Sequence, residues 1–265
     1  MRERRQTRRH GGELIYTTND EYGPIEVVES AFERSLHFGS PAKQSSILLD
    51  NHQMLALSYT HALLAPLIFQ PLPQRILLVG LGGGSVASFL LHHFPDAEID
   101  VVELRQRVYY VARRYFHLPD SLQLTVYIES IERYMYHHRS RLQNSYDLVL
   151  IDAFDGEGVS AEIANPIFCR EIRDLLSPRG VLGINLWSGA DGGAAFVVEL
   201  LMTAFDRNLL RLDVEEKGNL IAITADKIPL QSRLDKCDRD ARHLTSELRL
   251  PFTNMVKRLR RLNLG

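Results

Sequence analysis

The sequence predicts an α/β fold in which a small antiparallel β region precedes a doubly wound, mostly parallel sheet. Two observations predict the parallel sheet. From residue 75 onward, short apolar runs alternate with segments of helical periodicity, as in chains whose parallel strands are joined by crossover helices. The first apolar run, Ile76–Val79, leads into a glycine-rich turn, and the second, Ile99–Val102, leads into Glu103. This order is typical of a nucleoside-binding unit.

The glycine turn predicts a backbone that comes close to a ligand. Gly80, Gly82, Gly83 and Gly84 supply the turn, and a helix is expected to begin at Gly84. Glu103 follows about 20 residues later, where a carboxylate accepts both hydroxyl hydrogens of a ribose. A purely structural turn between strand and helix is the alternative interpretation of the same pattern.

The remaining elements are predicted from periodicity and from turn residues. Three short β-like pieces, at 13–18, 25–29 and 45–50, predict the N-terminal sheet, and the apolar spacing of 54–69 predicts one helix. From the glycine turn onward we expect helix 84–94, strand 99–103, helix 106–115, strand 122–128, helix 130–138, strand 147–151, helix 166–176 and strand 180–186. Helix 193–206, an antiparallel strand pair at 209–214 and 219–224, and an amphipathic helical segment over 230–263 complete the chain.

This order of elements suggests a division of the chain into five parts. We expect a basic flexible N-terminus at 1–12, a small β region at 13–53, a connecting helix at 54–73, a catalytic α/β domain at 74–229 and a C-terminal helical segment at 230–265. The five arginines of the first nine residues are interpreted as a solvated terminus, with a nucleic-acid-binding arm as the alternative.

Carboxylates follow three of the predicted parallel strands. Glu103 follows the second strand, Glu129 the third, and Asp152 the fourth, with Asp155 three residues further on. Because ligands bind beyond the carboxyl ends of the strands in a doubly wound sheet, these residues are candidates for a binding site. Two alternatives stay open: Glu129 as a charge at a helix N-terminus, and Asp152 as a turn or helix cap.

Composition limits the class of partner. The chain has 31 basic and 33 acidic residues and a formal net charge of −2, so no overall positive field attracts nucleic acid or an anionic membrane. Its two cysteines argue against a disulfide framework and favour the reducing cytoplasm, and no stretch is apolar over the length of a bilayer. No His, Cys or carboxylate spacing indicates a metal, so a small-molecule ligand is expected.

The chain resembles the spermidine synthases, or polyamine aminopropyltransferases, which share the Rossmann-like class I fold of S-adenosylmethionine-binding methyltransferases. The segments that carry the resemblance are Tyr22-Gly-Pro-Ile-Glu-Val, Leu49-Asp-Asn-His-Gln53, Tyr59, the glycine turn, Glu103, Glu129 and Tyr146–Asp155.

The resemblance implies a role for each of these site residues. Glu103 would hold the ribose and Glu129 the adenine of S-adenosylmethionine or its decarboxylated form, bound as donor rather than as a permanent cofactor. Asp152 would be the general base and Asp155 would orient an amine substrate, with Gln53 and Tyr59 as further substrate-binding residues. A homodimer is implied as well.

Two departures from the family pattern bear on specificity. Gly83 stands where the family's Gly-Gly-Gly-Asp-Gly turn has an aspartate, which removes an anion from the donor ammonium and favours the intact donor with its carboxylate. The family's Asp-Glu-x-x-Tyr-His-Glu stretch becomes Ala56-Leu-Ser-Tyr-Thr-His-Ala62, which lacks the acids expected along a polyamine.

Other residues near the predicted site have simpler interpretations. His61 is expected to pack a helix, and Tyr59 and Trp187 belong either to the core or to a stacking surface. Asn185, at the end of the fifth strand, is a candidate for orienting substrate.

We therefore expect an enzyme that transfers an alkyl group from a sulfonium nucleoside to an amine or another small nucleophile. Aminopropyl transfer follows from the resemblance, and methyl transfer is the alternative. A relative that binds the nucleoside without turnover is a further alternative. A nicotinamide-dependent oxidoreductase is disfavoured, because no His-Arg pair or Tyr-x-x-x-Lys motif for hydride chemistry is evident.

Overall fold

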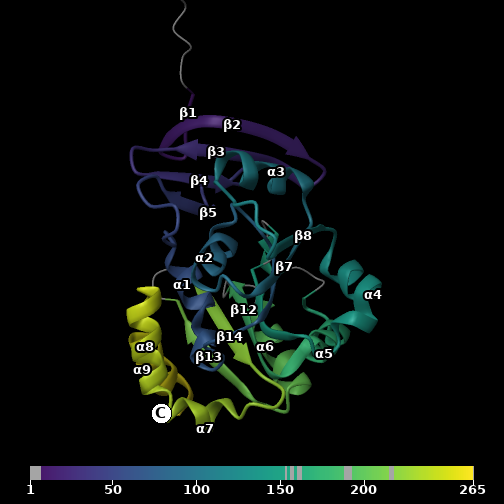
Figure 1. The fold of residues 1–265 in the computed structure, drawn as a ribbon. Coiled ribbons are helices and arrows are strands. Elements are labelled where there is room, and N and C mark those ends of the chain that lie inside the picture. Colours follow the sequence, from purple (N-terminus) through teal and green to yellow (C-terminus); the bar gives the residue numbers. More distant parts are fainter. Residues whose placement is uncertain are drawn as a thin grey trace, which may run out of the picture.

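The computed structural model describes residues 7–152, 154–155, 158–159, 163–187, 193–214 and 218–264, and of 154, 155, 158 and 159 it describes the backbone alone. Figure 1 shows a small sheet at the top and a larger sheet with its helices below it. The predicted α/β fold with a small N-terminal β region is confirmed.

The N-terminal sheet is five-stranded, antiparallel and ordered along the chain. Its strands are β1 (Arg8–Arg9), β2 (Gly12–Asp20), β3 (Gly23–Glu29), β4 (Glu33–His37) and β5 (Lys43–Leu48). Strand β4 was not expected, because a charge begins it and it alternates less clearly than its neighbours. Sheet pairing also begins at Arg8, inside the segment expected as a flexible terminus.

The larger sheet has seven strands in the order β13-β14-β12-β9-β6-β7-β8. Strands β12, β9, β6, β7 and β8 run parallel, and β14 pairs antiparallel with both β12 and β13, as predicted. Their bounds are β6 (Arg75–Val79), β7 (Glu98–Glu103), β8 (Leu124–Ile128), β9 (Tyr146–Ile151), β12 (Leu176–Trp187), β13 (Leu209–Asp213) and β14 (Asn219–Thr224). A short hairpin, β10 (Phe154–Asp155) with β11 (Gly158–Val159), follows β9.

Both faces of the larger sheet are covered by helices, so its parallel strands are apolar on both sides. One face packs on α4 (Ile131–Leu142), α5 (Pro166–Leu175) and α6 (Gly193–Ala204). The other packs on α2 (Ser85–His93), α1 (Ser58–Leu63) and the C-terminal helices. Helix α3 (Gln106–Tyr115) turns Val108 and Val111 toward the N-terminal sheet, which joins the two sheets.

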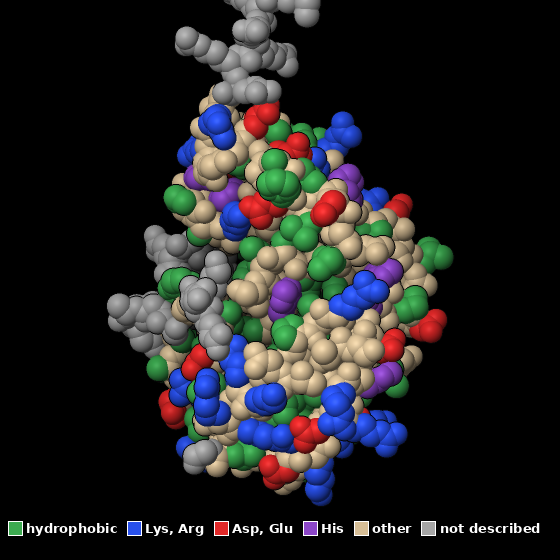
Figure 2. Space-filling model, turned by 90° about the vertical axis from the view of Figure 1, so that its left-hand side faces the viewer, with side chains coloured by type: hydrophobic (Ala, Val, Ile, Leu, Met, Phe, Trp, Pro, Cys, Tyr) green, Lys and Arg blue, Asp and Glu red, His purple; other side chains and the backbone are tan. Residues whose placement is uncertain are grey.

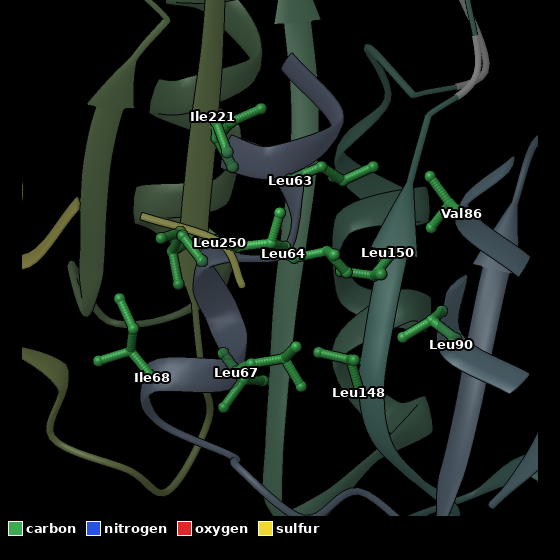
Figure 3. Packing of buried hydrophobic residues seen from close by; sticks show 14 of the residues in the cluster. Leu63, Leu64, Leu67, Ile68, Val86, Leu90, Leu148, Leu150, Ile221 and Leu250 are labelled. Carbon is green, nitrogen blue, oxygen red and sulfur yellow. The ribbon is translucent and has the colours of Figure 1, made fainter. Parts of the chain in front are cut away.

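The single helix predicted over 54–69 is wrong. The segment forms a six-residue helix, α1 (Ser58–Leu63), and a 3-10 turn, η1 (Ala65–Ile68). Pro66 lacks a backbone N–H and disfavours helical geometry in the residue before it, so the helix stops at Leu63. The apolar spacing is still used, because Leu63, Leu64 and Leu67 are buried against the sheet (Figure 3).

The segment 230–263 forms three helices, α7 (Leu230–Leu234), α8 (Asp238–Leu248) and α9 (Phe252–Asn263). Arg249 in the left-handed region and Pro251 separate α8 from α9. Figure 2 shows the Lys and Arg side chains of this part of the surface with acidic ones among them. On the surface of α9, Arg258 donates to the Asp213 carbonyl, and Arg260 pairs with Asp238.

Among the described residues, no helix is long and apolar enough to cross a membrane.

Candidate functional site

The candidate site lies where β6 and β9 end side by side. From this pair the chain continues to β7 and β8 on one side and to β12 on the other, so it is the switch point at which doubly wound sheets bind ligands. Val79 pairs with Ile151 in the register, and the Asp152 amide donates to the Val79 carbonyl across 2.8 Å. The glycine turn after β6 and Asp152 after β9 are therefore neighbours.

The glycine turn has the conformation that its sequence predicts. Gly80, Gly82 and Gly84 have φ of 91°, 53° and 80°, in the left-handed region where a side chain is strained. Gly84 is the N-cap of α2, and its amide donates to the Leu81 carbonyl at 2.8 Å. The turn thus brings the backbone to the start of α2, a place that suits an anionic or polar ligand group.

Gly83 has a different reason to be glycine. A Cβ added there would lie 2.8 Å from Ser45 Oγ and 2.8 Å from Phe116 Cδ1. Ser45 comes from β5 and Phe116 follows α3, so the space for a side chain at this position is filled from both sheets. Because Phe116 and Ser45 are buried, an acid at Gly83 would require them to move.

Glu103, at the end of β7, is turned toward the glycine turn. Its carboxylate accepts hydrogen bonds from the amides of Leu81 (2.9 Å) and Arg105 (2.8 Å). Burial raises its pKa above the usual range, against the lowering effect of these backbone N–H groups. The carboxylate is therefore preorganised beside the turn, in the place predicted for a ribose ligand.

Glu129 is anchored to the end of β7, because its amide donates to the Glu103 carbonyl at 3.1 Å. Its carboxylate turns to α4, where His137 Nδ1 lies at 3.1 Å and His138 Nε2 at 3.9 Å. The cap of α4 is Ser130, whose side chain accepts from the Arg133 amide. Glu129 directly precedes this cap, so a charge at the N-terminus of α4 stays an alternative interpretation of this residue.

Asp152 is held by two side chains from other elements. Asn185 Nδ2, at the end of β12, donates to Asp152 Oδ1 at 2.8 Å, and the Tyr59 hydroxyl of α1, which donates to the Gln44 carbonyl, lies beside the same carboxylate. Burial raises the pKa of Asp152, and the polar groups of Asn185 and Tyr59 oppose the rise. A carboxylate with a raised pKa is a stronger base, which suits general base catalysis.

Tyr59 closes the site from the side of the N-terminal sheet. Its hydroxyl lies 3.0 Å from the Gln44 carbonyl of β5 and next to Asp152. Burial, followed by the charge of Asp152, raises the Tyr59 pKa well above its usual value, so the hydroxyl keeps its proton. Residues Gln44 and Ser45 also lie against Gly82, so β5 covers both the turn and Asp152.

Three other residues singled out from the sequence either lie away from this site or have side chains outside the described part of the structure. His61 bonds the Leu55 carbonyl at 2.9 Å, as expected for helix packing. Gln53 is exposed, and among the hydrogen bonds of the described residues its side chain makes none to Glu103 or Asp152. The Asp155 side chain lies outside the described part of the structure, as does most of loop 153–163.

The structure adds residues that the sequence did not indicate. Ser45, Phe116 and Gln44 reach the turn from elements that are distant in sequence. Asn219, the first residue of β14, donates through Nδ2 to Asn185 Oδ1 at 3.0 Å. No sequence signal finds these residues, because each contact depends on the packing of the two sheets or on strand register.

Comparison with known proteins gives relatives that match nearly the whole chain. A polyamine aminopropyltransferase of Neisseria meningitidis serogroup A is 31% identical over 256 residues, which is 96% of each chain. No family model matches the chain. The chain belongs to the polyamine aminopropyltransferase family. It is thus a member of a family of transferases, as the resemblance of its motifs implied.

Solved structures of other proteins superpose on this chain and agree on its fold. A spermidine synthase in complex with the transition-state analogue AdoDATO superposes with a TM-score of 0.66 at 16% identity, covering 90% of both chains. Human methyltransferase-like protein 13 in complex with SAH superposes with a TM-score of 0.64 at 26% identity, covering 73% of this chain and 93% of that one. The class I methyltransferase type of fold is therefore confirmed.

Proposed function

We propose that the protein transfers the aminopropyl group of decarboxylated S-adenosylmethionine to a small amine. Family membership over 96% of the chain supports the reaction class. The observation that carries the proposal is the half-buried carboxylate of Asp152, which lies beside the glycine turn with Asn185 and Tyr59 against it. This arrangement has a base and a donor-binding loop within one site.

The chemistry requires little beyond alignment and one base. The acceptor nitrogen attacks the carbon next to the donor sulfur, the N–C bond forms as the C–S bond breaks, and the bond pair leaves with sulfur, which becomes a neutral thioether. Asp152 takes the proton that the amine must lose. Because the sulfonium is already a good leaving group, positioning supplies most of the rate enhancement.

The roles of the other residues follow from their positions. Glu103 lies beside the turn with a carboxylate suited to a ribose, and the turn 80–84 suits the donor tail. For Glu129 we propose contact with the adenine, supported by its bond to the end of β7 and by the family resemblance. Asp155, three residues after Asp152, would orient the amine.

Methyl transfer from intact S-adenosylmethionine is the second candidate. The observation that favours it is Gly83, where Ser45 and Phe116 fill the space of the acid that the family turn carries. Without that anion, a donor that retains its carboxylate meets less repulsion.

Side-by-side calorimetry with the two donors in one buffer tests the proposal. Preference for the decarboxylated donor, followed by formation of a longer polyamine from a diamine such as putrescine, is the expected result. Preference for the intact donor supports methyl transfer, and binding of neither donor favours a non-catalytic relative.

We further propose that the protein is a cytoplasmic homodimer. Free, buried Cys169 and Cys237 suit a reducing compartment, and burial raises the Cys169 pKa to about 11, which makes it a poor nucleophile.

The proposed dimer is supported by exposed aromatic side chains, because Phe32 and Tyr22 of the N-terminal β region suit a subunit contact. Light scattering coupled to size exclusion gives the mass, and a monomer at micromolar concentration would contradict the dimer.

A further inference from the structure

Two side-chain amides form a hydrogen-bonded chain that ends on Asp152. Asn219 Nδ2 donates to Asn185 Oδ1 at 3.0 Å, and Asn185 Nδ2 donates to Asp152 Oδ1 at 2.8 Å. The chain runs across three neighbouring strands, from β14 through β12 to the end of β9. Asn185 in its middle is 3% exposed, so water has little access to its amide.

Strand register explains why these two amides meet. In the antiparallel pair, Asn185 lies opposite Ile221 and Trp187 lies opposite Asn219. Residues 185, 187, 219 and 221 therefore share one face of the sheet, and Asn219 is the diagonal neighbour of Asn185. The contact is fixed by backbone pairing rather than by a flexible loop.

Only one direction of donation satisfies every group in this chain of hydrogen bonds. An ionised Asp152 only accepts hydrogen bonds, so Asn185 must present its NH2 group to it. The Asn185 carbonyl then points to Asn219, which must donate. If the Asn185 amide turned by half a rotation, its carbonyl would face the carboxylate and the NH2 would face a donor.

We propose that Asn219 is a positioning residue for Asp152, which fixes the Asn185 amide with its NH2 group toward the carboxylate. A hydrogen bond donated to a carboxylate favours the ionised form, whereas a carbonyl in that place favours the protonated form, which is no base. The effect on rate rests on the proposed function, but the orientation of the amide does not.

The surroundings of Asp152 make this orientation matter. The side chains that face it are Tyr59 from α1 and Asn185 from β12, and neither is charged. Among the described residues no ion pair reaches Asp152, and the Asp155 side chain lies outside them. Asn185 and Tyr59 are therefore the two side chains that favour the ionised form of Asp152, and Asn185 does so only when its NH2 group faces the carboxylate.

The test follows the protonation of Asp152 directly, without substrate. Protein labelled with ¹³C at aspartate carboxyl carbons is titrated by NMR, and the Asp152 signal is assigned from its loss in Asp152→Asn. The titration midpoint is compared in the wild type, Asn219→Leu, Asn185→Leu and the double variant. Asn219→Leu removes the donor with little change in volume and adds no charge.

Asn263→Leu is the matched control. Asn263 also makes side-chain hydrogen bonds to the sheet, donating to the Arg211 carbonyl at 2.9 Å and accepting from the Arg211 amide at 2.8 Å. It lies in α9 and contacts β13 rather than Asp152. A general loss of packing would affect both variants alike.

We expect the Asp152 midpoint to move upward in Asn219→Leu and to stay unchanged in Asn263→Leu. In the Asn185→Leu background, Asn219→Leu should add nothing, because Asn219 acts through the amide. An unchanged midpoint in Asn219→Leu, or an equal shift with and without Asn185, overturns the proposal. If Asn219→Leu does not fold, Asn219→Ala, which also lacks the donor and adds no charge, must raise the midpoint instead.

Kinetics then separate this proposal from the proposed function. If the wild type transfers an aminopropyl group, kcat of Asn219→Leu should fall by up to about tenfold, as expected from losing one hydrogen bond between neutral groups, with donor KM unchanged. If the wild type transfers nothing, the proposed function fails while the NMR result still decides the role of Asn219.

Discussion

At the scale of single residues, the site shows two kinds of glycine. Gly80, Gly82 and Gly84 are required by backbone conformation, and their pattern was enough to predict the turn from the sequence. Gly83 is required by packing, because Ser45 and Phe116 occupy the space of its side chain. The sequence showed that the family's acid was absent but not what replaced it, since Ser45 is 38 residues away from the turn and belongs to another sheet.

Restoring a side chain at Gly83 should therefore destabilise the protein rather than improve it. Gly83→Ala places a Cβ 2.8 Å from Ser45 Oγ and Phe116 Cδ1, and overpacking of this kind costs about 1–3 kcal/mol of unfolding free energy. Donor affinity should fall with it, because the turn must shift. Urea unfolding and calorimetry with the donor measure the two effects.

Adding Ser45→Gly to Gly83→Ala removes one of the two obstructing atoms and should recover part of the lost stability. Full stability and donor affinity in Gly83→Asp alone would show that the turn has room for the family's acid.

Asp152 illustrates how a group that we propose to be catalytic costs stability. Its pKa is raised in the folded protein, so at a pH above that pKa the buried charge opposes folding. Asp152→Asn removes the charge and retains one acceptor for Asn185. We expect the variant to lose activity by at least roughly 100-fold, the usual contribution of a general base, while its free energy of unfolding at pH 7 rises.

The stability gained by Asp152→Asn over the wild type should depend on pH. As pH falls through the folded pKa of Asp152, the wild type takes up a proton and the advantage of the variant shrinks, until it vanishes near the unfolded pKa. Urea unfolding of both proteins between pH 4 and about 8 measures the difference. An advantage that does not change with pH would show that the charge is not its cause.

At the scale of elements, one arginine ties the N-terminal sheet to the end of β7. Arg105 Nη2 and Nε donate to the two oxygens of Asp20, at 2.7 and 3.1 Å, and Nη2 also donates to the Gly23 carbonyl at 2.8 Å. Its guanidinium lies over the Phe38 ring, 4.4 Å from the centroid. The Arg105 amide meanwhile bonds Glu103, so the link between sheets ends in the candidate site.

Arg105→Met should leave the half-buried carboxylate of Asp20 without its arginine partner. Breaking a buried pair by removing one partner costs about 3–5 kcal/mol, and we expect a loss of that size in urea unfolding together with weaker donor binding. Arg107→Met is the control, since the hydrogen bond that Arg107 Nη1 donates to Thr18 Oγ1 at 3.3 Å is exposed. Equal losses in the two variants would contradict a specific role for Arg105.

The elements also show where sequence patterns suffice. Strands β6, β7 and β9 and helix α3 were predicted almost to the residue, because each combines an apolar period with a clear turn at its end. The helix over 54–69 was wrong because the apolar period continues through Pro66, where the backbone cannot stay helical. Asn219 was placed in a strand, but its contact with Asn185 depends on register, which the sequence did not specify.

At the scale of the whole molecule, the packing of helices far from the site depends on another arginine. Arg173 of α5 donates to Asp226, in the connection after β14, and to the Ala204 carbonyl at the end of α6. Lys227 Nζ lies 2.9 Å from the second oxygen of Asp226. Arg173 and Asp226 together therefore connect α5 with the end of α6 and with the segment that leads to the C-terminal helices.

Asp226 should make global stability depend on pH in the opposite sense to Asp152. Burial raises its pKa, but the hydrogen bonds from Lys227 and Arg173 outweigh burial and hold the pKa below its usual range. Its contribution to stability is thus complete above the unfolded pKa and is lost as pH falls through the folded one. Asp226→Asn should cost about 1–3 kcal/mol at pH 7, because Arg173 loses its charged partner, and the cost should shrink in acid.

Urea unfolding at a series of pH values from 7 downward, together with transfer activity at pH 7, checks this expectation. Activity per folded molecule should be unchanged, because no residue of the site contacts Asp226 in the described part of the chain. A cost that stays constant as Asp226 protonates would mean that the variant acts through packing. If the folded variant instead loses transfer activity at pH 7, Asp226 is coupled to the candidate site. Acid would then lower activity and stability together.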